Sequence, residues 1–299
     1  MEIPMFIIIV LCLIAVLLFQ AVRCHRARLR SIARLKGFQT KSVLLTRGET
    51  TYIDEGEGEV ILSIHGIFGG YDQAYETCQD FRKQFRIIAP SRFGYPGSDC
   101  PQECSPHEQA AALAELLDEL GIRKVNVLGT SAGGTIAIRF ALDYPGRTNR
   151  LILYCSAMPY PEKPAVYADY AGPPGFLIHD YPLLLISPFF KMIMGMDPKT
   201  IHTMLPVAFR RKGVRVDAGI TNPDMARNYD GYPVENLRMP ILILHAKDDQ
   251  LARFSAVEAA LPRFRDPEFI RFEEGGHLMK GHAESIRQSV LKFMAKPPV

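Results

Sequence analysis

Short apolar runs that alternate with helical patterns constrain the fold of this 299-residue chain more than any other feature. Each run is continuous rather than alternating in polarity, which is typical of a strand buried on both faces. Strands of this kind form a mostly parallel sheet that helices cover on both sides, with ligands bound at the carboxyl ends of the strands. We predict strands at 60–66, 85–90, 124–129 and 150–156, and a strand followed by a polar turn at 239–249 and again at 268–277. Helices are predicted at 107–120 and 132–143.

One long stretch, residues 157–237, interrupts this alternation between two predicted core strands. It holds apolar helical patterns such as LLLISPFFKMIM at 183–194. A structureless loop of this length is improbable inside a compact domain. We therefore expect a helical cap over the strand ends, inserted after the strand at 150–156.

The N-terminal segment is almost wholly apolar from residue 3 to residue 22. Twenty helical residues span about 30 Å, the thickness of the hydrocarbon core of a bilayer. A cleaved signal peptide starts with basic residues and has a shorter apolar stretch, whereas this segment starts with Glu2 and has no convincing cleavage motif. The length and the basic flank also disfavour a buried core helix. We expect a transmembrane anchor at 3–22, a basic juxtamembrane linker at 23–44 and a globular body at 45–299.

The positive charge of the chain is concentrated next to that anchor. Residues 1–36 carry six basic side chains against Glu2, a net +5, so the overall +3 leaves −2 for the rest of the chain. A mildly acidic body argues against a nucleic-acid-binding protein. Since Lys and Arg stay preferentially on the cytoplasmic side, we expect a single-pass membrane protein with a cytoplasmic body and a basic flank on anionic lipid.

The six cysteines form no compact disulfide framework, which agrees with a cytoplasmic body. Cys100 and Cys104 are close in sequence, but no second Cys or His pair completes a zinc site with them. We expect free thiols, no metal site and no cofactor.

The residues that suggest chemistry centre on Ser131. The segment Gly129-Thr130-Ser131-Ala132-Gly133 follows the strand at 124–129 and opens the next helix, which gives G-x-S-x-G in a strand–turn–helix setting. Such a turn strains the serine backbone and raises its hydroxyl above the sheet, while the glycines avoid clashes with neighbouring elements. We predict that Ser131 is a nucleophile; the alternative is a simple glycine-rich helix start.

A serine hydroxyl needs a base, and His277 lies just past the last predicted strand, after two glycines that can turn it toward Ser131. An acid must then orient the imidazole. Asp248 and Asp249 close the strand at 239–249, after the serine and before the histidine in the chain. The residues alone leave open which of the two aspartates reaches His277.

The oxygen of a tetrahedral intermediate also needs N–H donors. The glycine-rich turn at 65–70 follows the first core strand and offers the backbone N–H of Ile67. The N–H of Ala132, the residue after the nucleophile, is the second expected donor. We interpret His65 as a structural residue that braces this turn.

Over about residues 45–297 the sequence resembles the α/β-hydrolase family. The resemblance rests on HGIFGG at 65–70, SRFGYPGSD at 91–99, GTSAGG at 129–134, and HAKDD at 245–249 with GGH at 275–277. It implies the family's eight-stranded type of mostly parallel sheet, flanked by helices. In relatives the turn H-G-x-x-D ends on the catalytic acid, which corresponds to Asp249. Here Ser91 stands where aspartate is usual, and the proline that usually follows the acid is missing.

The resemblance implies acyl transfer to Ser131, followed by hydrolysis by water that His277 activates. Relatives that open epoxides or remove halides carry aspartate at the serine position, so the sequence argues against both reactions. The anchor and the apolar cap favour carboxylic esters or thioesters of apolar acyl groups, either small molecules or lipid-like. Amide hydrolysis and carbon–carbon bond cleavage by the same three residues stay open, as does a non-catalytic binding protein.

Overall fold

Eight strands form one sheet in the computed structural model of the protein, which describes residues 4–296. The strand order is β1-β2-β4-β3-β5-β6-β7-β8; β2 pairs antiparallel with β1 and β4, and the other neighbours are parallel. The predicted, mostly parallel sheet is therefore confirmed. The strands are β1 (Lys41–Leu45), β2 (Gly48–Glu55), β3 (Val60–Ile64), β4 (Arg86–Pro90), β5 (Val125–Thr130), β6 (Thr148–Tyr154), β7 (Ile241–Ala246) and β8 (Glu268–Phe272).

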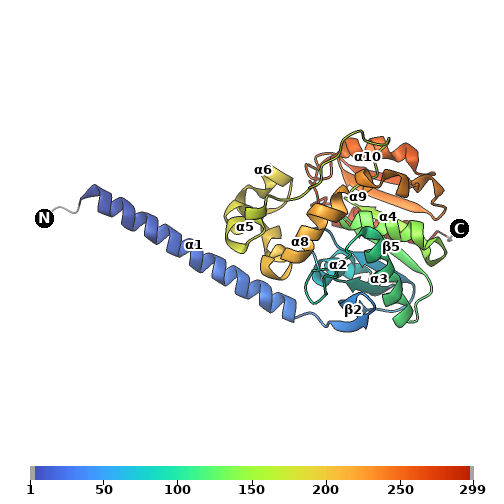
Figure 1. Ribbon diagram of the computed structural model, residues 1–299, viewed down its shortest axis with the longest axis horizontal. Helices are drawn as coiled ribbons and strands as arrows, with labels where there is room; N and C mark the ends of the chain where they lie inside the picture. The colour runs from blue at the N-terminus through green and yellow to red at the C-terminus, as the bar shows by residue number, and fades with distance from the viewer. Residues whose placement is uncertain (1–3, 297–299) are drawn as a thin grey trace.

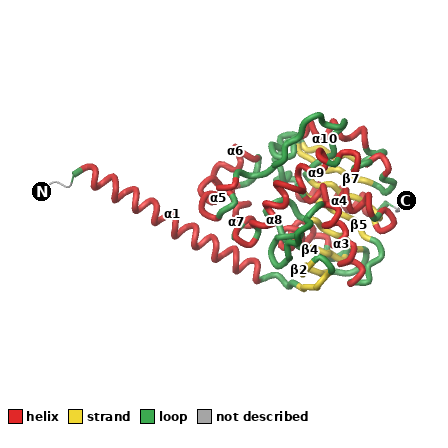
Figure 2. The backbone as a smooth tube through the Cα atoms, in the orientation of Figure 1, coloured by secondary structure: helices red, strands yellow, loops and turns green. Residues whose placement is uncertain are grey.

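Helices cover both faces of this sheet (Figure 2). One apolar core joins the sheet to α3 (Pro106–Glu119), α4 (Gly133–Asp143) and α10 (Phe254–Ala260). A second core on the other face joins it to α2 (Tyr71–Cys78) and α11 (Ala283–Met294). This layering leaves the carboxyl ends of the parallel strands open to a site.

The predicted helix at 107–120 shows why these elements form where they do. Ser105 ends the preceding loop, and its side chain accepts a hydrogen bond from the Glu108 N–H at 3.2 Å. Pro106 occupies the first helical turn, where its missing N–H costs nothing. Gly121 follows the helix with φ +65°, a conformation that favours glycine and ends the helix.

The expected basic linker at 23–44 is wrong. The helix α1 (Met5–Lys36) continues through residues 23–36, because this stretch is rich in Arg, Ala and Leu and no glycine or proline interrupts it before Gly37. The strand β1 then begins at Lys41, so the sheet starts before the expected boundary at residue 45. The antiparallel hairpin of β1 and β2 lies at one edge of the sheet, and its polar residues gave no apolar run to detect.

Short helices occupy the chain between β6 and β7, where a cap is expected at 157–237. They are α5 (Asp180–Ile186), α6 (Phe190–Met194), α7 (Ile201–Met204), α8 (Arg211–Val216) and α9 (Asn222–Arg227). A third apolar core joins α5, α6 and α7 to Cys24 and Ala27 of α1. The helix α1 extends from the body as a single rod, with the cap beside it (Figure 1).

The helix α1 is long and apolar enough to cross a membrane, by length and composition alone. None of its most apolar 18-residue window is buried against the rest of the chain. Packing against the body begins only beyond that window, at Cys24, Ala27, Ser31 and Leu35. The apolar half of α1 is thus a candidate membrane span, and its basic half belongs to the folded body.

Candidate active site

Ser131 lies in a tight turn between β5 and α4. Its φ of +52° is strained for a residue with a side chain. A Cβ on Gly129 would lie 2.6 Å from the Cβ of Ala137, and one on Gly133 would lie 2.4 Å from the carbonyl oxygen of His65. Both glycines are therefore required for the close approach of strand, turn and helix that lifts the Ser131 hydroxyl above the sheet.

His277 faces this hydroxyl from the turn after β8. Gly275 and Gly276 precede it with φ of +126° and +62°, so the chain turns sharply where only glycine is relaxed. The Nε2 atom of His277 lies 2.9 Å from the Oγ atom of Ser131. Its Nδ1 atom lies 2.8 Å from the Oδ2 atom of Asp249. The side chain of His277 is 5% exposed, so water competes little for either contact.

Asp249 is buried in the turn that follows β7, and both oxygens of its carboxylate accept hydrogen bonds. The Oδ1 atom accepts from the backbone N–H groups of Leu251 and Ala252, at 2.8 and 2.9 Å. The Oδ2 atom accepts from His277 and from the Nε2 atom of His245, at 3.1 Å. Burial opposes the charge, but the hydrogen bonds from the two imidazoles outweigh it and hold the pKa of Asp249 below its usual range.

Asp248 is exposed and has a different environment. Its carboxylate accepts hydrogen bonds from the N–H groups of Gly275 and Gly276, at 3.2 and 2.8 Å. Asp248 therefore fixes the turn that carries His277. The structure brings Ser131, His277 and Asp249 together and places Asp248 outside that group.

His245 also belongs to the site, although its sequence context did not mark it as a site residue. It is fully buried, and its Nε2–H is shared between Oδ2 of Asp249 and the carbonyl oxygen of Ala252, at 3.1 and 2.6 Å. Its Nδ1 atom has no partner among the described residues. The available signal was its position four residues before Asp249, close to the end of the strand that precedes this aspartate.

The turn at 65–70 places Ile67 in the wall of the cavity beside Ser131. The carbonyl oxygen of Gly66 accepts from Nδ1 of His65 at 2.7 Å and from Nη2 of Arg92 at 3.3 Å. Because a trans peptide points its C=O and N–H in opposite directions, these bonds direct the Ile67 N–H away from Arg92. Ile67 and Ala132 both line the cavity that holds the Ser131 hydroxyl.

His65 stabilises this turn through hydrogen bonds, as we expected of a structural residue. Its Nε2 atom accepts a hydrogen bond from the backbone N–H of Arg92 at 3.0 Å. The ring proton is therefore on Nδ1, which donates to the carbonyl oxygen of Gly66. Burial first, and then the charge of Arg92, hold the pKa of His65 well below its usual value. Arg92 in turn pairs with Asp217 of the cap through two contacts of 2.6 Å, with both side chains almost fully buried.

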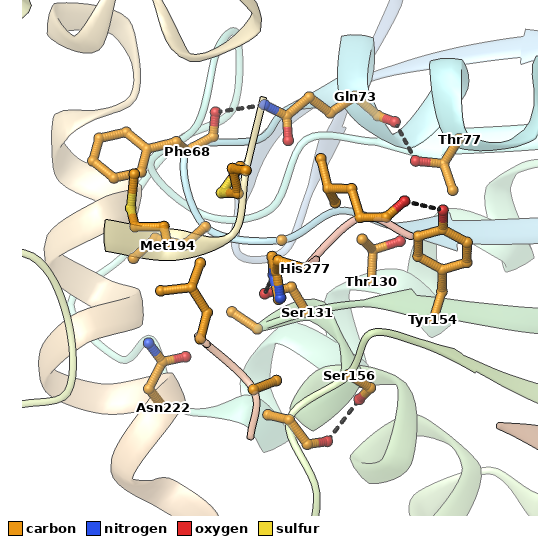
Figure 3. A pocket seen from close by; sticks show the side chains of 18 of the residues that line it. Phe68, Gln73, Thr77, Thr130, Ser131, Tyr154, Ser156, Met194, Asn222 and His277 are labelled. Atoms are coloured by element: carbon orange, nitrogen blue, oxygen red, sulfur yellow. Dashed lines mark hydrogen bonds between the residues drawn. The ribbon is translucent and has the colours of Figure 1, made fainter. Parts of the chain in front are cut away.

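A cavity of about 1000 Å³ opens onto Ser131 and His277. Gln73, Thr77 and Tyr154 lie on one side of this pair, and Asn222 lies on the other (Figure 3). Most of the lining is apolar, including Met158, Met194, Met196, Met204, Met225, Leu251 and Val257. No group of three or more His, Cys, Asp or Glu side chains suited to a metal ion occurs within residues 4–296.

Comparisons with known proteins agree with this architecture. Residues 59–191 match a family model described as the alpha/beta hydrolase fold. A 2-hydroxy-6-oxo-6-phenylhexa-2,4-dienoate hydrolase of Burkholderia cepacia is 26% identical over 81% of this chain and 90% of its own length.

Two solved structures share the fold at lower identity. An esterase from Exiguobacterium antarcticum matches with a TM-score of 0.68 and 19% identity, over 86% of this chain and 100% of its own. A membrane phospholipase A, described as a bacterial virulence factor, matches with a TM-score of 0.63 and 19% identity, over 98% of this chain and 100% of its own. The second match therefore extends into the segment that α1 occupies.

Proposed function

The chain belongs to the α/β-hydrolase fold family, and from this premise we propose that it is a membrane-anchored serine hydrolase of carboxylic esters. The observation that carries the proposal is the continuous hydrogen-bonded series from Ser131 through His277 to Asp249. In this proposal Ser131 is the nucleophile, His277 the general base and Asp249 the acid that orients it. The N–H groups of Ile67 and Ala132 are the oxyanion donors.

The proposed reaction has two steps. The Ser131 oxygen attacks the ester carbonyl carbon while His277 Nε2 takes the hydroxyl proton, and the carbonyl oxygen becomes an oxyanion that Ile67 and Ala132 stabilise. The imidazolium returns its proton to the leaving alcohol as the C–O bond breaks, which leaves an acyl-enzyme. Water then loses a proton to His277 and attacks the acyl carbon, and the acid is released as Ser131 regains its proton.

Carbon–carbon bond cleavage is a second candidate, because the Burkholderia cepacia relative is named for a dienoate substrate. A dienoate carries a carboxylate, which a pocket binds best with a buried cation. Among the described residues that line the cavity, the basic side chains are Arg253, which is exposed, and Arg287, which is partly exposed and paired with Glu284. Apolar walls without a buried cation favour an uncharged acyl group, so we favour ester cleavage.

We also propose that α1 is an uncleaved anchor and that the body is cytoplasmic. Its apolar window is unburied, and the basic residues follow that window rather than precede it. The match to the membrane phospholipase A covers 98% of this chain and is consistent with this assignment. Protease added to intact cells should spare the body, and digestion of the body would contradict the orientation.

A fluorophosphonate probe tests the enzyme proposal directly. We expect the wild type to be labelled and Ser131→Ala to be unlabelled, with p-nitrophenyl esters hydrolysed only by the wild type. Absence of labelling in the wild type would favour a non-catalytic binding protein. A 2-hydroxy-6-oxo-dienoate, offered beside the esters, separates the two candidate reactions: faster turnover of the dienoate than of any ester would reverse our preference.

A further inference from the structure

The basic half of α1 packs against the cap. Cys24 and Ala27 are buried in the same apolar core as α5, α6 and α7. Farther along, the Ser31 hydroxyl donates to the carbonyl oxygen of His202 in α7 at 3.1 Å. The Nε atom of Arg28 lies 3.7 Å from a carboxylate oxygen of Asp180, at the start of α5.

The same helix is also fixed to the sheet domain. Arg34 contacts Glu76 at 2.7 Å and is hydrogen-bonded to Asp72, both on α2. Asp72 is fully buried and also pairs with Arg210 of the cap, at 2.8 Å. The buried carboxylate of Asp72 therefore links α1, the cap and the body through its two arginine partners. Any membrane that holds the apolar half of α1 thus fixes the position of the cap.

The cap lies close to the end of the apolar run. The run ends at Val22 and the first buried contact is Cys24, two residues later. Arg28, which pairs with α5, lies six residues beyond the run, or about 9 Å along the helix axis. The polar headgroup region adds roughly 5–8 Å on each side of the hydrocarbon core. For a helix perpendicular to the membrane, the beginning of α5 therefore lies at the outer limit of the headgroup region, and any part of the cap nearer the N-terminal end of α1 lies closer to the hydrocarbon core.

The part of the cap nearest the apolar half of α1 exposes large apolar side chains. We call Leu185, Phe189, Met192 and Ile193 the cap tip; they are 39%, 54%, 71% and 50% exposed. They belong to α5, to α6 and to the turn between them, which project from the body toward the N-terminal end of α1 (Figure 1). Clustered exposed side chains of this kind mark a surface that binds a partner or a membrane.

The charges around the cap tip suit an anionic lipid surface. Lys191 is exposed between Phe189 and Met192. Arg26 and Arg30, on the docked part of α1, are exposed, and within residues 4–296 neither makes an ion pair with a carboxylate. Apolar side chains interleaved with basic ones are typical of segments that lie in the membrane interface.

The helix α6 also separates this surface from the cavity. Met192 and Ile193 face outward, whereas Met194 and Met196, directly after them, line the cavity above Ser131 (Figure 3). We infer that the cap tip inserts into the interface of the membrane that anchors α1, and that apolar esters enter the cavity from that membrane at α6. The inference rests on the proposed function, which it extends to lipid-borne substrates.

The chain contains no tryptophan, so single tryptophans report depth without background. The experiment uses the full chain in phosphatidylcholine–phosphatidylglycerol vesicles that contain acyl-brominated lipid, which quenches tryptophans in the membrane. Met192→Trp tests the cap tip, Leu13→Trp tests α1, and Leu44→Trp, on an 81% exposed position of β1, is the control outside the membrane.

We expect strong quenching and a blue-shifted emission for Leu13→Trp and Met192→Trp, and neither for Leu44→Trp. Quenching of Leu13→Trp with Met192→Trp unquenched would overturn the inference and leave the anchor standing. If neither is quenched, the anchor fails and the inference fails with it. Because fluorescence needs no turnover, this result is independent of whether the chain is an esterase.

An activity measurement tests the route of entry. Phe189→Ser combined with Met192→Ser removes apolar contacts with lipid without altering a residue that lines the cavity. We expect hydrolysis of a long-chain ester in vesicles to fall by about tenfold, with p-nitrophenyl acetate in solution unchanged. Equal loss on both substrates, or no loss on either, would overturn entry from the membrane. No hydrolysis of either ester by the wild type would instead contradict the proposed function.

Discussion

The substitution Asp249→Asn tests the proposed reaction most sharply, because it changes charge and hydrogen-bond donors without changing shape. The backbone N–H groups of Leu251 and Ala252 both donate to Oδ1 and hold an oxygen there. The amide nitrogen of asparagine must then occupy the Oδ2 position, where it faces His277. The Nδ1 atom of His277 has to accept, so its proton moves to Nε2 and faces Ser131, and the imidazole can no longer act as the base.

A wrong tautomer of this kind lowers kcat by about 10⁴, which corresponds to about 5.4 kcal/mol of lost transition-state stabilisation. Asp248→Asn is the matched control, since it makes the same change one residue earlier. Asp248 holds the N–H groups of Gly275 and Gly276, and asparagine keeps an oxygen that can accept from them. We expect its kcat to fall by less than about tenfold, close to the loss of one hydrogen bond.

The assay is the initial rate of p-nitrophenyl ester hydrolysis at neutral pH, after circular dichroism has shown that both variants keep the fold. A fluorophosphonate probe run in parallel reports the reactivity of Ser131 without requiring turnover. Activity of Asp249→Asn within about tenfold of the wild type would refute the tautomer argument. Equal loss in the two variants would show that the turn, and not the acid, controls the rate.

Three further predictions concern the buried groups around the site. His245→Phe removes one donor to Asp249, so kcat should fall about tenfold at unchanged KM, and His245→Gln, which can still donate, should restore part of it; a change confined to KM would contradict this role. Asp217→Ala leaves the Arg92 guanidinium buried and unpaired, so urea unfolding should show a loss of about 3–5 kcal/mol; a loss near zero would mean that water solvates Arg92. Because the pKa of His65 is depressed in the folded chain, only the unfolded chain binds a proton at this position just below about pH 6.5. The free energy of unfolding should therefore fall by up to about 1.4 kcal/mol per pH unit on acidification. The variant His65→Asn should reduce that slope.

Much of the architecture follows from local pattern. Continuous apolar runs predicted six of the eight strands, because a strand buried on both faces consists almost entirely of apolar residues. The hairpin of β1 and β2 was not predicted, because exposed strands at the edge of a sheet contain threonine, lysine and glutamate as readily as valine. The basic half of α1 was predicted to be a linker because its charged side chains were expected to face solvent or lipid. In the structure Arg34 instead pairs with carboxylates of the body.

For the site, the sequence by itself determined which residue types stand at which strand ends. Glycines flank Ser131 and precede His277, and tight turns of this kind admit few other residues. The sequence alone therefore predicted that both side chains lie in tight turns at strand ends. The residues by themselves left both aspartates open, and the family resemblance favoured Asp249. Tertiary structure showed that Asp249 faces His277 and that His245 shares its carboxylate. It also placed the cap tip beside the anchor. These contacts join segments far apart in the chain, and only the packing of the sheet and helices sets the distances between them.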